Sequence, residues 1–315
     1  MYNSAPFIER ALLSAITAGA NSGYPFDIWI VDNNSTDNSV EVVQRVAIKY
    51  DAALQIVRCD ESGAGAARNY GVRHSSGSWL QFLDADDTLE PTKLEQQIGL
   101  SGEAEWIIAG YQDVRQGVLS EINLPNRDPW KGLTFGSGIG HTGSNLYRRE
   151  LFNRVGGYDT SLTTAEDLDL YRRLLASGAP YAIDNAVRSY YYHHTYDRLT
   201  SGDQKASMFR RIEVFHRGIE YLKAAEEKYW LAEKAYFIQA MLMSFRYLAT
   251  YDLQRANHWY QKYGSDLHSL DYTCEHIFLP TYTRLYPYLG FRNVEALRLL
   301  LARVLPEGLK ARLKG

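Results

Sequence analysis

Short apolar runs alternate with helical patterns along the first two thirds of the chain. Short runs rich in β-branched or apolar residues predict strands at residues 28–31, 54–57 and 79–83. Polar turns and amphipathic helical patterns separate these strands. Such an alternation is typical of βαβ units around a mostly parallel, Rossmann-like sheet, so we predict an α/β domain over residues 1–203.

The pattern changes at residue 204, beyond which apolar positions recur at helical spacing. Two long amphipathic helices are predicted, one from Met208 to Leu222 and one from Tyr229 to Tyr251. The turn signal Ser201-Gly202 separates the two patterns. The sequence therefore predicts an all-α region over residues 204–315.

Composition and charge narrow the class of protein. The 315 residues carry 34 basic and 37 acidic side chains, a formal net charge of −3, which disfavours nucleic acid as a partner. Cys59 and Cys274 lie far apart in the sequence, so neither a zinc cluster nor a disulfide framework is indicated, and a cytoplasmic location fits. No apolar run approaches the roughly 18 residues that a membrane-spanning helix needs.

An acidic cluster, Asp84-Ala85-Asp86-Asp87, follows the predicted strand at 79–83. Carboxylates this close repel one another unless a cation lies among them, and oxygen ligands suit Mg²⁺ or Mn²⁺. Asp87 also fits the N-cap of a following helix, so we expect Asp84 and Asp86 to face the ligand. Because ligands bind at the carboxyl ends of strands in open α/β sheets, the cluster predicts a metal-dependent active site.

Two further segments carry candidate chemistry. The small residues from Gly63 to Ala67 allow a ligand to approach the backbone, and Arg68 beside a helix start favours phosphate. Asp167 lies in the first turn of a predicted helix, where the helix dipole alone stabilises a carboxylate. The same residue is a candidate general base that takes a proton from a substrate hydroxyl, and both interpretations stay open.

Five motifs, in this order along the chain, resemble those of family 2 glycosyltransferases with the GT-A fold. They are Tyr2-Asn3-Ser4, the run from Ile30 to Asp37, the run from Gly65 to Asn69, the run from Phe82 to Asp87, and Glu166-Asp167. The resemblance covers about residues 2–200. It implies an inverting glycosyltransferase that moves a sugar from a nucleotide-diphosphate donor to a saccharide or lipid-linked acceptor in cell-surface polysaccharide synthesis.

The resemblance also implies roles for single residues. Asp167 would be the catalytic base, and Asp86 with His194 would hold the divalent cation. Asp84 would contact the ribose of the donor. The implied nucleotide-sugar-binding set is Asn3, Asp32, Asn33, Arg68, Asp84 and Ala85.

Two features depart from the family pattern. Asn33 stands where many relatives have Asp, which leaves the donor nucleotide open. The apolar first strand that normally leads into Tyr2-Asn3 is missing, so we expect an incomplete sheet and a true start upstream of Met1. These departures keep an alternative open, a catalytically impaired nucleotide-sugar-binding protein.

The glycine-rich segment 132–145 and the last predicted helix each have two interpretations. The segment is either a mobile loop over the acceptor pocket or an ordinary connection. From residue 292 to 314 the chain carries six basic and two acidic residues beside an apolar helix face. That helix either contacts the inner face of a membrane or packs on the chain or a second subunit. The oligomeric state stays open.

Overall fold

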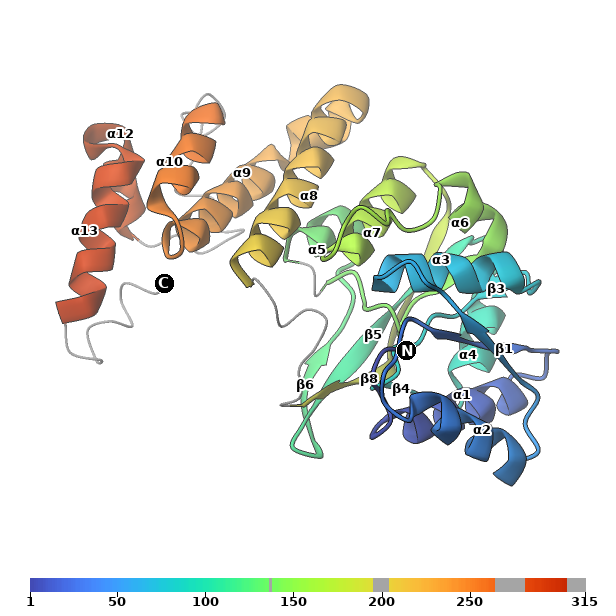
Figure 1. The fold of residues 1–315 in the computed structure, drawn as a ribbon. Coiled ribbons are helices and arrows are strands. Elements are labelled where there is room, and N and C mark those ends of the chain that lie inside the picture. The colour runs from blue at the N-terminus through green and yellow to red at the C-terminus, as the bar shows by residue number, and fades with distance from the viewer. Residues whose placement is uncertain (136–137, 195–203, 264–280, 305–315) are drawn as a thin grey trace. The chain divides into compact units, whose positions relative to one another are not determined.

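The structure is a computed structural model that describes residues 1–315 apart from 136–137, 195–203, 264–280 and 305–315 (Figure 1). The chain divides into two compact units, residues 1–202 and 203–315. In the described part of the chain, no helix is long and apolar enough to cross a membrane.

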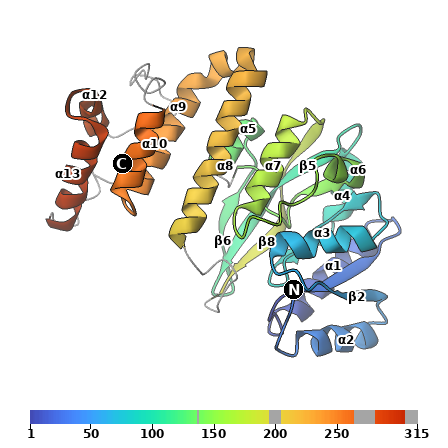
Figure 2. The same cartoon turned by 45° about the horizontal axis from the view of Figure 1, so that its top comes forward.

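A small parallel sheet opens the first unit. Its elements are α1 (Ile8–Asn21), β1 (Ile28–Asp32), α2 (Ser39–Lys49), β2 (Leu54–Arg58) and α3 (Ala64–His74). Ile30 of β1 pairs with Ile56 of β2, and Ile30 packs with buried apolar residues of α1 and α2. Helices α2 and α3 lie on opposite sides of this sheet (Figures 1 and 2). Asp32, the last residue of β1, is thereby placed at the carboxyl edge of the sheet.

Six strands form the second sheet of this unit. They are β3 (Trp79–Leu80), β4 (Thr88–Leu89), β5 (Trp106–Arg115), β6 (Val118–Asn123), β7 (Leu146–Arg148) and β8 (Tyr181–His193). Their order is β3-β7-β5-β8-β4, and β6 pairs with β5. Helices α4 (Lys93–Leu100), α5 (Pro129–Phe135), α6 (Arg149–Arg154) and α7 (Glu166–Ala176) belong to the same unit. Residues 106–109 of β5 are buried, which makes β5 the centre of the core.

The α/β class is confirmed, whereas the expected mostly parallel sheet is wrong, because the observed sheet is mixed. Strands β1 with β2 and β5 with β8 pair in parallel. The pairs β3–β7, β4–β8, β5–β6 and β5–β7 are antiparallel. One physical reason is local: the turn Gln116-Gly117, with φ of 52° and 78°, joins β5 directly to β6, and a two-residue hairpin is necessarily antiparallel.

The predicted helix start at Asp87 is also wrong. Thr88 and Leu89 form strand β4, and α4 begins only at Lys93. The Asp87 carboxylate accepts a hydrogen bond from the backbone N–H of Tyr192 at 2.9 Å, so it anchors β8 rather than capping a helix. A pairing partner more than 100 residues away overrides the local capping pattern.

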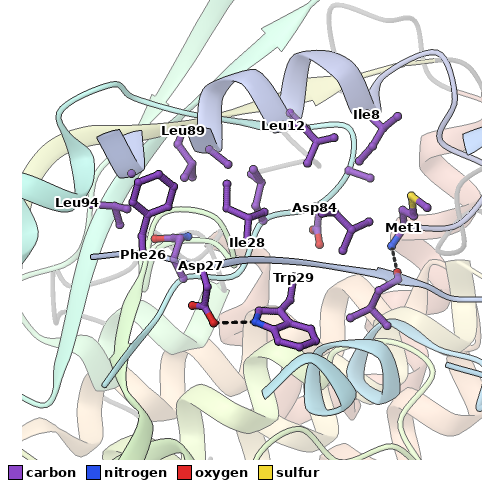
Figure 3. A pocket seen from close by; sticks show the side chains of 18 residues that line it. Met1, Ile8, Leu12, Phe26, Asp27, Ile28, Trp29, Asp84, Leu89 and Leu94 are labelled. Carbon is purple, nitrogen blue, oxygen red and sulfur yellow. Dashed lines mark hydrogen bonds between the residues drawn. The ribbon is translucent and has the colours of Figure 1, made fainter. Parts of the chain in front are cut away.

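The two sheets of this unit share no hydrogen-bonded strand pair among the described residues, in agreement with the expectation of an incomplete sheet. A cavity of about 190 Å³ lies between β1 and residues 81–85, with α1 along it (Figure 3). At one end the Met1 amine donates to Val31 O at 2.7 Å, and Met1 O accepts from Asn33 N at 2.9 Å. Asp84 lies at this same end of the cavity, so the segment that follows β3 meets the carboxyl end of β1 here.

The second unit is helical throughout its described residues, which confirms the expected helical region. Its elements are α8 (Gln204–Ala225), α9 (Glu227–Ala249), α10 (Leu253–Lys262), η1 (Thr281–Leu285), α12 (Tyr286–Leu289) and α13 (Phe291–Val304). Buried aromatic side chains from several of these helices form its core, among them Phe215, Phe237, Phe245 and Phe291.

A buried histidine lies in this aromatic core. His216 is 2% exposed, and its ring stacks on Phe245 at 5.2 Å and on Tyr263 at 4.5 Å between centroids. Burial lowers the pKa of His216 to about 3, and the positive charges of Lys262 and Lys223 act in the same direction. The folded unit therefore holds a neutral imidazole at neutral and mildly acidic pH.

Stability should consequently fall in mild acid. Below about pH 6.5 the unfolded chain binds a proton at His216 that the folded chain does not bind, so the free energy of unfolding decreases as the pH falls from 6.5 toward 3. At pH 5 this difference amounts to about 2 kcal/mol. Urea unfolding of the full chain at pH 7.5 and pH 5 measures the loss, and His216→Phe is expected to reduce it by that amount. The exposed His258 of α10 provides the control His258→Gln, and equal losses in both variants would contradict the prediction.

Candidate active site

Arg68 of α3 connects two acidic segments of the site. Its guanidinium donates to Asp84 Oδ1 at 2.6 Å and to Glu166 Oε1 at 2.9 Å, and the Arg68 side chain is only 13% exposed. Burial, the largest single influence, opposes ionisation of Asp84, but the charge and hydrogen bond of Arg68, the charge of His141 and that of the N-terminus together outweigh it and hold the pKa of Asp84 below its usual value. Asp84 is therefore an ionised carboxylate in a largely enclosed site.

Glu166 and Asp167 share the first turn of α7 but differ in their partners. The Glu166 carboxylate is bound by Arg68, and burial together with the Asp167 charge raises its pKa. Asp167 Oδ1 accepts from the backbone N–H of Leu168 at 2.8 Å, and no ion pair holds it among the described residues. Ala165, the residue that precedes α7, has a φ of 61°, a left-handed conformation that redirects the chain into the helix. Of these two carboxylates, Asp167 is thus the one that forms no ion pair with a basic side chain of the described residues.

Asp86 lies beside a histidine from the end of the second sheet. The atoms Asp86 Oδ2 and His194 Nε2 are 2.6 Å apart, although 108 residues separate them in sequence. The ring of Phe7 stacks on His194 with centroids 4.5 Å apart, and Arg10 of α1 donates to Asp86 O at 2.7 Å. The structure therefore brings together the two residues that the resemblance assigns to the cation.

A second set of possible metal ligands includes a histidine that sequence reasoning did not assign to the site. Asp84, Asp87 and His141 each offer one ligand atom, and these atoms lie within 4.8 Å of one another. Burial lowers the pKa of His141, while the charges of Asp84 and Asp167 act in the opposite direction. Two carboxylates and a neutral imidazole fit a divalent cation such as Mn²⁺.

The loop that carries His141 is anchored from α4. Lys93 is fully buried, donates to Ser144 O at 2.9 Å and also donates to Gln97 Oε1. Gln97 Nε2 donates to the same Ser144 O at 2.9 Å. Burial lowers the pKa of Lys93 well below its usual value. Residues 138–145 are thus packed into the fold, which favours an ordinary connection over a mobile loop for this part of the glycine-rich segment.

The predicted nucleoside-binding residues gather at the end of β1. Asp32 is 6% exposed and accepts from Ser35 N at 3.2 Å, and Asn3 Oδ1 accepts from Thr36 N at 2.8 Å. The Asn33 amide donates to Cys59 O at 3.0 Å and to Glu61 O at 2.7 Å, and it accepts from Gly63 N at 2.8 Å. In this structure Asn33 therefore ties β1 to the loop that precedes α3.

Sequence reasoning located the strand-end carboxylates but missed three features. His141, Lys93 and the Arg68–Glu166 ion pair were not assigned. For His141 the sequence offers only a weak signal, a lone histidine in a glycine-rich segment. Lys93 falls in an amphipathic helix, where a lysine normally faces solvent, so no sequence signal marks its burial.

Comparison with known proteins gives matches to glycosyltransferases. Residues 1–156 match the family model described as "Glycosyl transferase family 2". An uncharacterized glycosyltransferase of Rickettsia conorii is 27% identical over 198 residues, which cover 59% of this chain and 32% of the relative. The succinoglycan biosynthesis protein ExoO of Rhizobium meliloti is 28% identical over 237 residues, 69% of this chain and 66% of the relative. The chain thus spans about a third of the first of these relatives and just under two thirds of the second.

Two solved structures share the fold. TarS 1–349 of S. aureus in complex with UDP-GlcNAc superimposes with a TM-score of 0.57 at 16% identity and covers 94% of this chain and 88% of TarS 1–349. The mannosyltransferase PcManGT of Pyrobaculum calidifontis, in complex with GDP-Man and Mn²⁺, has a TM-score of 0.53 at 20% identity, with coverage of 95% and 85%. At these identities the two matches establish the fold alone.

Proposed function

The chain belongs to glycosyltransferase family 2 and has the GT-A fold, and from this premise we propose that it transfers a sugar from a nucleotide-diphosphate donor to a saccharide or lipid-linked acceptor. One observation carries the proposal. Arg68 joins the ionised Asp84 to the first turn of α7, so the donor-binding carboxylate and the candidate base belong to one site. The relative ExoO, named for succinoglycan biosynthesis, supports a role in cell-surface polysaccharide synthesis.

In this proposal the donor binds between the carboxyl end of β1 and residues 84–86. Asn3, Asp32 and Asn33 surround the nucleoside, Asp84 and Ala85 contact its ribose, and Arg68 contributes positive charge. Structural neighbours in complex with UDP-GlcNAc and with GDP-Man support a nucleotide sugar as donor. Which nucleotide is bound is left to experiment, because the Asn33 amide is already bonded to the backbone.

A divalent cation, Mn²⁺ or Mg²⁺, belongs to the proposal. Asp86 and His194 are its assigned ligands, and Asp84, Asp87 and His141 form an adjacent donor set. When bound, such a cation neutralises negative charge on the diphosphate of the donor and of the product. The structure of PcManGT in complex with GDP-Man and Mn²⁺ supports this part of the proposal.

Asp167 is the proposed base. Its carboxylate takes the proton of an acceptor hydroxyl, whose oxygen forms a bond to the anomeric carbon as the bond from that carbon to the diphosphate oxygen breaks. The nucleoside diphosphate leaves, and a single direct displacement inverts the anomeric configuration. Glu166 cannot readily take this role because Arg68 already binds its carboxylate.

A panel of nucleotide sugars tests the proposal. We expect one donor class to raise the melting temperature of the wild type in the presence of Mn²⁺ and to be hydrolysed or transferred. Asp86→Ala is expected to lose the Mn²⁺-dependent shift and at least about 100-fold in turnover, because it removes a ligand of the cation.

The control is Glu121→Ala, at an exposed carboxylate of β6, a strand that carries none of the proposed site residues, and it should behave as the wild type. Full activity of Asp86→Ala would contradict its assignment to the cation. Donor binding without turnover by the wild type, for every donor and acceptor, would point instead to the alternative, a nucleotide-sugar-binding protein.

A further inference from the structure

We propose that the outer face of α12 and α13 is a docking surface for an anionic lipid bilayer. This outer face consists of the exposed apolar residues Tyr288, Leu289, Leu297, Leu300 and Val304 with the exposed basic residues Arg292 and Arg303. It lies in the helical unit and goes beyond the proposed transfer reaction, because it concerns where the protein binds rather than what it converts.

The inner side of α13 is already occupied by its own unit. Phe291 is fully buried, with its ring 4.6 Å from the ring of Tyr260 in α10, and Val294 is buried on the same side. At 3.6 residues per turn, Leu297, Leu300 and Val304 fall within about 60° of one another, on the side away from Phe291. We call Leu297, Leu300 and Val304 the leucine row. This row does not belong to the core that holds α13 in place.

The exposed fraction of these side chains is high for apolar residues. Leu297, Leu300 and Val304 are 52%, 56% and 68% exposed, and Tyr288 of the preceding α12 is 84% exposed. Single exposed leucines are ordinary, but a continuous row along one helix face is typical of a surface that another phase or molecule covers.

Charge identifies the kind of partner. Glu295 is the one acidic residue from position 281 to 304, and it is fully buried, bound by Arg298 at 2.6 Å and by the Tyr286 hydroxyl at 2.5 Å. The exposed charged residues of this stretch are Arg284, Arg292 and Arg303, all of them positive. On the helix, Arg292 and Arg303 lie along one flank of the leucine row. An apolar row flanked by arginines matches the boundary between acyl chains and anionic headgroups.

A second copy of the chain fits the same face less well. A two-fold contact places the same surface on both sides, so the exposed charges that residues 281–304 of the other copy offer to Arg292 and Arg303 are again arginines. No exposed carboxylate among residues 281–304 is available to offset this repulsion. An anionic bilayer offers both the apolar phase and the opposite charge.

Vesicle flotation of the full chain tests the proposal without any substrate. We expect binding to vesicles of phosphatidylglycerol and phosphatidylcholine, and little binding to phosphatidylcholine alone. The pair Leu297→Ser and Leu300→Ser should lower the partition coefficient about 10-fold or more, because it removes apolar contact with the acyl chains. The pair Arg292→Glu and Arg303→Glu should lower it by a similar factor on anionic vesicles. The matched control, Leu119→Ser with Ile122→Ser, changes two exposed apolar residues of β6 and should leave binding unchanged.

Four outcomes would overturn the proposal. The first is equal binding to both kinds of vesicle or to neither, and the second is a loss of binding in the control pair. A dimer that the leucine pair converts to a monomer in light scattering, with vesicle binding unaffected, would identify a second copy as the partner. A fall in melting temperature of about 4 °C or more in the leucine pair would show that the chain itself covers this face. None of these measurements depends on sugar transfer, so the result is independent of the proposed function.

Discussion

Asp167→Asn is expected to bind the donor as tightly as the wild type and to lose sugar transfer about 10³-fold. The amide keeps the size of the side chain but cannot accept a proton, and a positioned general base contributes about 10²- to 10⁴-fold. The neighbouring Glu166 cannot readily compensate because Arg68 binds its carboxylate at 2.9 Å. The loss should therefore appear in kcat, with the dissociation constant of the donor unchanged.

Glu166→Gln provides the matched control in the same helical turn. This variant keeps Asp167, and Arg68 keeps its ion pair with Asp84, so we expect transfer to fall by less than about 10-fold. Steady-state kinetics and calorimetric donor binding on both variants measure the contrast. The reverse pattern, in which Glu166→Gln abolishes transfer and Asp167→Asn retains it, would remove Asp167 as the base.

Arg68→Met is expected to destabilise the first unit by about 3 kcal/mol and to abolish donor binding. The substitution leaves Asp84 and Glu166, which are 33% and 14% exposed, without their shared cation in a largely enclosed site. Removing one partner of a buried ion pair costs about 3 to 5 kcal/mol, because the remaining charge is neither solvated nor paired. Denaturant unfolding in the absence of divalent cations measures the destabilisation, and thermal shift with nucleoside diphosphates measures binding.

Two further variants separate this effect from a general loss of positive charge. Arg73→Met changes an exposed arginine of the same helix and should alter stability by less than about 0.5 kcal/mol. Adding Asp84→Asn and Glu166→Gln to Arg68→Met removes the unpaired charges, so most of the lost stability should return while donor binding stays absent. If the added substitutions leave the stability unchanged, burial of unpaired charge is not the cause of the defect.

Local patterns in the sequence were sufficient to place the strand-end carboxylates. Strand β1, which is parallel to β2, ends at Asp32, and Asp84 follows shortly after β3. These positions follow from short apolar runs that end in polar residues, a signal that needs no knowledge of distant partners. The same local reasoning failed at Asp87, where a capping pattern stands in front of a strand.

Contacts between distant segments decided the remainder of the site. The approach of His194 to Asp86, of Arg68 to Glu166 and of Lys93 to Ser144 joins residues 108, 98 and 51 positions apart. A single sequence carries no pairwise signal for such contacts. They depend on how β8, α7 and α4 pack around the mixed sheet, and that packing fixes which residues share a buried space.

The sequence by itself determined the α/β class of the first unit, the helical second unit, and the carboxylates at the strand ends, because each follows from hydrophobic period and chain order. Tertiary structure alone decided that Arg68 binds Glu166 and that Asp167 forms no ion pair among the described residues. It likewise decided that His141 enters the site and that Asp87 anchors β8. These outcomes depend on burial and on long-range pairing, which determine where charge can be stabilised and which local preferences prevail.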